Sequence, residues 1–129
     1  MKKYIGILSV LLLTMPVQAG FSNCTSDKGG EIVTVSGQTF CRSAEKMNWW
    51  SAYTWCQAMG GHLPTVTELC PTASSITHSA SCGRNYGKDI WTATPMGANS
   101  ANNYTIRWSG TAIHRDTGRS DYFFVYCAE

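Results

Sequence analysis

The apolar residues between positions 49 and 59 recur at helical spacing, which predicts an amphipathic helix. One face of that helix gathers five side chains, namely Trp49, Ala52, Tyr53, Cys56 and Met59. Asn48 precedes the helix, and its side-chain oxygen can accept a hydrogen bond from a free N–H of the first turn. Gly60 follows, and a left-handed residue at this position would end the helix. The pattern thus predicts both helix ends and places Cys56 on the buried face.

A second, shorter helix is predicted directly afterwards. Thr65 and Glu68 are spaced as a capping box, in which each side chain satisfies the backbone N–H of the other residue. Pro71 lacks the N–H that a continuing helix needs, so this helix ends early. From Cys70 to Gly83 the chain is rich in Ser and Thr and has no periodicity, which predicts a surface loop.

Alternating and β-branched runs predict strands. The first two, at residues 31–35 and 38–41, are separated by the turn residues Ser36 and Gly37 and form a hairpin. The others cover residues 89–94, 104–108 and 122–127. The polar stretch from Thr111 to Asp121 is expected to be a loop. Together these elements predict an α+β fold in one domain of roughly 110 residues.

The first 19 residues have the pattern of a bacterial signal peptide. Lys2 and Lys3 form a charged start, an apolar run covers residues 5–15, and Val17 and Ala19 suit the small-residue positions of a signal-peptidase site. An uncleaved anchor is the alternative, but the run is shorter than the ~20 apolar residues that span a bilayer. We therefore expect a signal peptide at 1–19 and a domain at 20–129, periplasmic, secreted or on the cell surface, without stable membrane insertion after cleavage.

The charge balance argues against nucleic acid as a partner. The chain carries 10 Lys and Arg against 8 Asp and Glu, and two of the lysines lie in the leader. Residues 20–129 are therefore neutral, and a neutral domain has no long-range field that attracts a polyanion. A local basic spot could still form from Arg107, His114, Arg115 and Arg119.

The 6 cysteines all follow the leader. An even number in a short exported chain is typical of a disulfide framework formed in an oxidising compartment. Zinc binding is the competing use, but no C-x-x-C pair is present. The sequence alone leaves many pairings open. A Cys24–Cys41 bridge would fasten the first hairpin, and a Cys70–Cys82 bridge would pin the Ser/Thr-rich loop.

The order of these motifs resembles the C-type lectin-like fold, and it is similar to the C-terminal lectin-like domains of intimin-type and invasin-type adhesins. The resemblance covers about residues 40–129 and rests on a few short motifs. They are W-x-x-A-x-x-x-C at 49–56, G-G-x-L at 60–63, L-P-T-x-x-E-L at 63–69, W-T at 91–92 and a final aromatic strand that ends in Cys127. The resemblance implies a compact fold with two short helices, a small, twisted, mainly antiparallel sheet and three disulfides. It also implies a Cys56–Cys127 bridge from the first helix to the last strand.

The sequence departs from the calcium-dependent members of that family. Their E-P-N or Q-P-D and W-N-D motifs are absent, and the nearest proline motif, at 94–96, offers no carboxylate. Asp116 and Asp121 are isolated, whereas calcium needs about 6–8 oxygen ligands brought together. We therefore expect no metal and no other cofactor.

Catalysis is not expected either. Nucleophilic catalysis needs a Ser or Cys beside a His with an orienting acid. His62, His78 and His114 are scattered along the chain without a motif, and the cysteines are better explained as paired.

Binding is the favoured function, because loops on a disulfide-held scaffold are well suited to recognition. Amide, aromatic and cationic side chains gather in the region 96–119. The candidate ligand-binding residues are Asn99, Asn102, Asn103, Tyr104, Arg107, Trp108, His114 and Arg115. The competing interpretation is that Tyr104 and Trp108 belong to the core and that the Asn run is a solvated turn.

The sequence therefore predicts an exported, non-catalytic domain that binds a protein or a glycan of the host or the bacterial envelope without calcium, as an adhesin-like, virulence-associated factor. The alternative is a small periplasmic assembly subunit or inhibitor that docks on another secreted protein.

Overall fold

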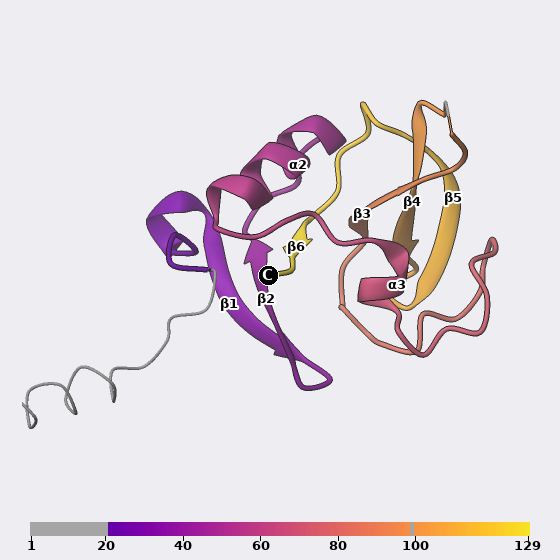
Figure 1. Cartoon of the computed structure of the whole chain (residues 1–129), viewed down its shortest axis with the longest axis horizontal. Coiled ribbons are helices and arrows are strands. Elements are labelled where there is room, and N and C mark those ends of the chain that lie inside the picture. Colours follow the sequence, from indigo (N-terminus) through magenta and orange to yellow (C-terminus); the bar gives the residue numbers. More distant parts are fainter. Residues whose placement is uncertain (1–20, 99) are drawn as a thin grey trace, which may run out of the picture.

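The computed structural model describes residues 21–98 and 100–129. They form a small α+β structure with two α-helices, two antiparallel three-stranded sheets and three disulfides. The α+β prediction is confirmed, although the expected single sheet is divided into two. Figure 1 shows the sheet β1–β2–β6 beside the sheet β3–β4–β5, with helix α2 above the first of them. The predicted signal peptide and Asn99 lie outside the described residues.

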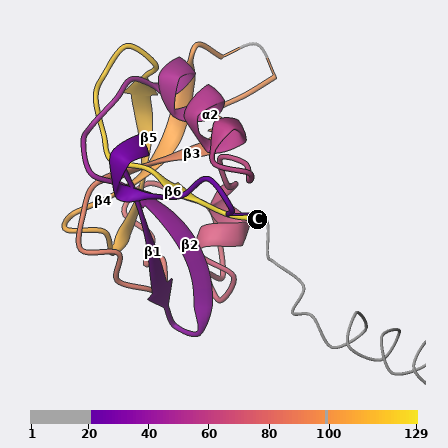
Figure 2. The same ribbon diagram turned by 90° about the vertical axis from the view of Figure 1, so that its left-hand side faces the viewer.

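The first sheet is built on the predicted hairpin, with β1 at Gly30–Val35 and β2 at Gln38–Ser43. Ser36 and Gly37 both have positive φ, 48° and 83°, as in the tight two-residue turns that match the twist of a hairpin. The predicted hairpin is confirmed, and Figure 2 shows it extending away from α2.

Helix α2 covers Trp49–Ala58 and has the predicted ends. The Asn48 side chain accepts a hydrogen bond from the Ser51 N–H at 2.9 Å, and Gly60 has a φ of 92°. Of the predicted apolar face, Ala52, Cys56 and Met59 are buried, but Tyr53 is 42% exposed, so its placement on the buried face was wrong. The second helix, α3, is a single turn at Val66–Leu69 with the expected capping box.

The second sheet contains a strand that the sequence did not predict. β3 covers Ile90–Pro95, β4 covers Asn102–Arg107 and β5 covers Ala112–Gly118, so the expected loop over 111–121 was wrong. β5 has few apolar residues, because part of its buried surface is polar. The Thr117 hydroxyl is hydrogen-bonded to that of Thr105 at 3.1 Å inside the structure, and such a pair hides the usual alternation of a buried strand.

The last predicted strand is shorter than expected. β6 is limited to Tyr126–Cys127, while Phe123 forms an isolated bridge with Met47 and Phe124 forms one with Ile90. These two aromatic residues therefore connect the β2–α2 segment to β3. The apolar run at 122–127 is explained by this bridging position and not by a continuous strand.

All three predicted disulfides are present, Cys24–Cys41, Cys56–Cys127 and Cys70–Cys82. The first two lie together in one buried cluster, and the third lies in a second cluster with Phe40, Tyr86 and Tyr126.

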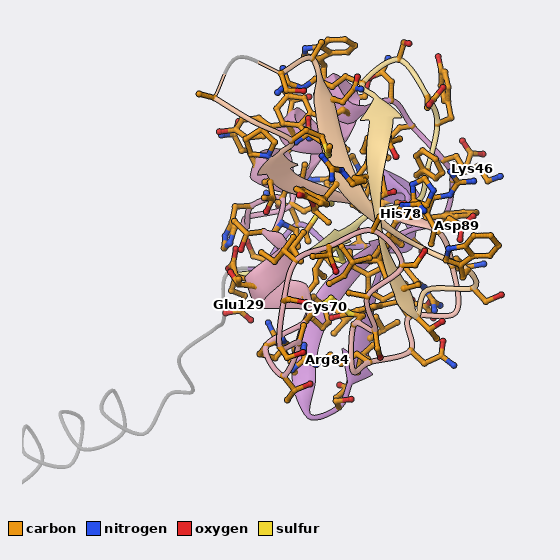
Figure 3. The ribbon with its side chains drawn as sticks, turned by 90° about the vertical axis from the view of Figure 1, so that its right-hand side faces the viewer. Lys46, Cys70, His78, Arg84, Asp89 and Glu129 are labelled. Atoms are coloured by element: carbon orange, nitrogen blue, oxygen red, sulfur yellow. A yellow bond between two sulfur atoms is a disulfide. The ribbon has the colours of Figure 1, made fainter. Side chains whose placement is uncertain are left out.

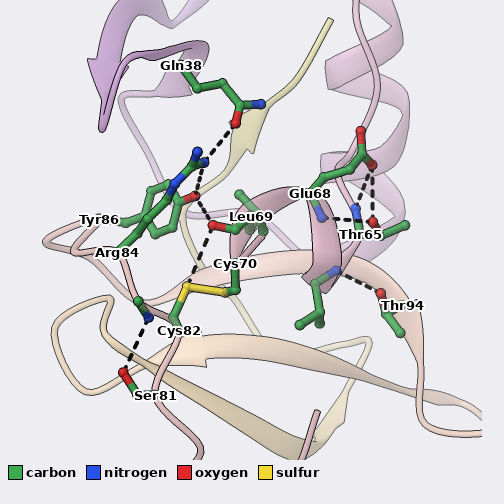
Figure 4. Close-up of a disulfide and its surroundings, with 12 residues drawn as sticks. Gln38, Thr65, Glu68, Leu69, Cys70, Ser81, Cys82, Arg84, Tyr86 and Thr94 are labelled. Atoms are coloured by element: carbon green, nitrogen blue, oxygen red, sulfur yellow. Dashed lines mark hydrogen bonds between the residues drawn. A yellow bond between two sulfur atoms is a disulfide. The ribbon is translucent and has the colours of Figure 1, made fainter. Parts of the chain in front are cut away.

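Figure 4 shows how the loop that contains Cys70–Cys82 is held. Tyr86 donates a hydrogen bond to the Leu69 carbonyl, and Arg84 donates one to Gln38 of β2 at 2.7 Å. Burial raises the pKa of the Tyr86 hydroxyl above its ordinary value, so this donor keeps its proton at neutral pH.

The disulfides also indicate where the chain folds. Three bridges are typical of an oxidising, extracytoplasmic compartment. Within the described part of the chain, no helix has both the length and the apolar character that crossing a bilayer requires.

Candidate ligand-binding site

The turn between β4 and β5 has an unusual backbone conformation. Trp108, Ser109 and Gly110 have consecutive positive φ angles of 61°, 62° and 83°, a region that costs a non-glycine residue roughly 1–2 kcal/mol. Gly110 is buried in this turn, and a Cβ atom there would lie 2.6 Å from the backbone nitrogen of Gly87. The turn therefore packs closely on the segment before β3, while the Trp108 side chain remains 61% exposed.

Trp108 lies on a shallow depression of about 320 Å³, which we call the Trp108 depression. It is lined by Asp89, Arg107, Trp108, Ser109 and His114. Arg107 Nε lies 3.9 Å from Asp89 Oδ2, and its guanidinium lies 5.3 Å from the ring centre of Phe123. The residues thus present one aromatic ring, one loosely paired cation and one carboxylate to solvent.

Three of the predicted site residues, Arg107, Trp108 and His114, are brought together in this depression. The exposure of Trp108 excludes the interpretation that it belongs to the core. His114 also contacts His78, with ring centres 4.6 Å apart. The link joins the site to the loop held by Cys70–Cys82.

The remaining predicted residues lie elsewhere. Asn102 and Tyr104 belong to the first half of β4, away from the turn, and Tyr104 packs partly against the second core cluster. Arg115 is exposed but lines none of the depressions that we describe. A ligand-binding role for these residues stays a prediction.

Asn103 is completely buried and has a structural role. Its side-chain oxygen accepts a hydrogen bond from Arg119 Nε at 2.6 Å. The Arg119 guanidinium lies 4.4 Å from the ring centre of Trp49, and the Trp49 indole N–H donates to the Thr92 carbonyl at 3.0 Å. This network ties α2 to the second sheet. Arg119 follows the end of β5 that pairs with Asn102, whereas Arg107 pairs with Ala112 at the other end, so the basic spot suggested by the sequence does not form as proposed.

Two lysines that the sequence analysis missed lie beside the Trp108 depression. A second hollow of about 280 Å³, the lysine depression, shares Asp89 and Ser109 with the first. It is lined by Lys46, Gly87, Lys88, Asp89, Ser109 and Phe124. Figure 3 shows Lys46 and Asp89 close together, with His78 on the same side of the molecule. Lys46 and Lys88 are 42 positions apart in the chain, and no local motif indicates that they meet.

The described residues limit metal binding and nucleophilic catalysis at this site. Among the described residues, no group of three or more His, Cys, Asp and Glu side chains is arranged to hold a metal ion, and no described cysteine is free. Asp89, Ser109 and His114 are the residue types of a nucleophilic triad, and they line the same depression. The Ser109 hydroxyl, however, has no hydrogen-bond partner among the described residues, and the Asp89 carboxylate faces Arg107.

Searches against protein-family models, curated proteins and solved structures gave no match for this chain.

Proposed function

We propose that this chain is an exported, non-catalytic binding domain of the C-type lectin-like type that recognises a protein or a glycan without calcium. The observation that carries the proposal is Trp108, a large ring held mostly exposed in a left-handed turn beside charged groups. The ring gains little from packing in the free protein, while the backbone conformation costs stability. Strain of this kind clusters at functional sites, and exposed tryptophan is a frequent anchor in binding surfaces.

The lectin-like part of the proposal is supported by contacts of the motif residues. Cys56 on α2 is joined to Cys127 on β6. Gly61 allows the end of α2 to approach the C-terminal segment, because a Cβ atom there would lie 2.2 Å from the Ala128 carbonyl oxygen. Leu63 and Trp91 are buried in the cluster around the same bridge. Residues from each of the motifs that carry the resemblance therefore meet in one part of the core, while Leu69 lies in the second cluster.

A hydrolase is the competing role, because Asp89, Ser109 and His114 line one depression. Nucleophilic catalysis needs a base within hydrogen-bond reach of the nucleophile, and the Ser109 hydroxyl is hydrogen-bonded to no base among the described residues. We expect that p-nitrophenyl acetate is hydrolysed no faster by the protein than by a Ser109→Ala variant. A turnover that Ser109→Ala abolishes would replace the binding proposal with an enzymatic one.

A binding screen tests the main proposal. The purified domain is presented to an array of glycans and to envelope proteins, with and without a chelator. Each hit is then measured with Trp108→Ala and with Trp50→Ala, a matched control because Trp50 is 53% exposed on α2, outside both depressions. We expect Trp108→Ala alone to weaken binding, by at least about tenfold for a stacked tryptophan.

Three results would count against the proposal. Strong sensitivity to chelator would exclude the calcium-free part. Equal losses for Trp108→Ala and Trp50→Ala would exclude the proposed site. Retention in the periplasm in complex with one partner protein, with no hit on the array, would favour the alternative role as an assembly subunit or inhibitor.

A further inference from the structure

Cationic side chains concentrate around the Trp108 depression although the domain is neutral as a whole. Lys46 from the segment before α2, Lys88 from the segment before β3 and Arg107 from the end of β4 all line the two adjoining depressions. Asp89 is the one carboxylate among the lining residues. Three cations against one anion leave this face with an excess of two positive charges.

The two lysines converge on one aromatic ring. The Nζ atoms of Lys46 and Lys88 lie 5.7 and 4.5 Å from the ring centre of Phe124, and neither forms an ion pair with a described residue. A ring face attracts a cation but leaves most of the three ammonium N–H donors unused. Both lysines line the lysine depression and carry the same charge, so an anion bound in that depression would be attracted by both of them.

Arg107 is also available to a ligand. Its Nε atom is 3.9 Å from Asp89 Oδ2, and both side chains are 39% exposed. An exposed pair at this separation is weak, because water screens the attraction. An incoming carboxylate or sulfate can therefore compete for the guanidinium donors, which can pair with two oxygen atoms of an oxyanion at once.

We infer that the ligand of this site is an anionic saccharide, with a ring stacked on Trp108 and its carboxylate or sulfate group bound by Lys88, Lys46 and Arg107. This inference rests on the proposed binding function and specifies its ligand class. The Trp108 depression, about 320 Å³, lies at the lower end of the size range of small-ligand sites, and the lysine depression of about 280 Å³ adjoins it. The small volume of the two hollows favours a saccharide, and an acidic protein is the alternative outcome of the test below.

Matched pairs of saccharides test the inference, because the two members of a pair differ in charge. We choose trigalacturonate with its methyl ester, and sialyllactose with lactose, measured by isothermal titration calorimetry. The acidic member of at least one pair should bind, and its neutral counterpart should bind at least about tenfold more weakly, as expected when charged hydrogen bonds are lost. Raising the salt concentration from about 50 to 500 mM should weaken binding of the acidic member, since exposed charges are screened.

Two lysine variants test whether the acidic saccharide binds at the lysine depression. Lys88→Met keeps the apolar stem over Phe124 and removes the charge, so it should weaken binding of the acidic saccharide roughly tenfold. Lys28→Met is the matched control, because it removes the same charge from η1 (Ser26–Lys28), outside both depressions. Circular dichroism confirms that both variants are folded.

The outcomes separate this inference from the proposed function. If acidic and neutral members bind equally and Trp108→Ala weakens both, the binding function stands and the anionic ligand is excluded. If no saccharide binds but a protein binds through Trp108, the ligand class is wrong. Equal effects of Lys88→Met and Lys28→Met would show a general charge effect and refute the site. If no ligand depends on Trp108, the proposed function itself fails.

Discussion

The Cys56–Cys127 disulfide should contribute more stability than Cys70–Cys82, and the difference can be calculated from chain length. A disulfide restricts the unfolded chain, and the loss of entropy grows with the logarithm of the loop that it closes. The loops are 71 and 12 residues long. At 25 °C these lengths give about 4.4 and about 2.8 kcal/mol. Removal of the longer link should therefore cost about 1.6 kcal/mol more.

The two bridges form a matched pair, because all four cysteines are at most 2% exposed. The double variants Cys56→Ala/Cys127→Ala and Cys70→Ala/Cys82→Ala each remove two buried sulfur atoms. The cavity costs are thus similar and largely cancel in the comparison.

Urea unfolding of both double variants, with the other disulfides intact, measures the difference in the free energy of unfolding. Equal losses, or a larger loss for Cys70→Ala/Cys82→Ala, would refute the chain-entropy reasoning. If only Cys56→Ala/Cys127→Ala is unfolded at 25 °C, the predicted order stands.

Two further predictions concern the segment after α2. Burial alone would raise the pKa of Glu68, but hydrogen bonds from the Thr65 N–H and from His62 hold it below the ordinary value of 4.5. The ionised carboxylate therefore stabilises the fold fully above that pH, and the stabilisation is lost as the pH falls and the group is protonated. Urea titrations should show that Glu68→Gln loses less stability than the wild type between about pH 5 and pH 3. Equal losses in the two proteins would exclude the effect. Gly61→Ala should lower stability by roughly 1–3 kcal/mol, because the new methyl group meets a backbone carbonyl oxygen of the C-terminal segment at 2.2 Å. Gly97→Ala is the control for thermal unfolding, since nothing lies within 4 Å of its Cβ position, and a Gly61→Ala variant as stable as this control would contradict the prediction.

Local signals in the sequence were sufficient for the parts of the fold that depend on neighbouring residues. The Asn48 cap, the capping box at Thr65 and the Ser36–Gly37 turn each involve residues at most a few positions apart. β5 was missed because Thr117 is buried against another hydroxyl and gives no apolar signal.

The part of the candidate site that comes from neighbouring residues was also predicted from the sequence. Arg107 and Trp108 are adjacent in the sequence, and their residue types indicated binding. Lys46 and Lys88 are brought to the site by the bridging position of Phe124, which contacts both lysines and pairs with Ile90. Such a meeting depends on tertiary structure, and no single segment of the sequence contains it.

Cys41 and Cys127 belong to different disulfides, yet they are directly opposite each other across β2 and β6. Facing residues of an antiparallel pair have Cα atoms about 4.5–5.5 Å apart, which is within the range that a disulfide can bridge. A Cys41 thiolate can therefore attack Cys127 and release the Cys56 thiolate, or a Cys127 thiolate can attack Cys41 and release the Cys24 thiolate. Either exchange creates a 41–127 isomer that keeps the strand pairing. Recombinant production should then depend on thiol exchange: oxidation by air would trap this isomer, and a glutathione buffer or a disulfide isomerase would convert it to the native form.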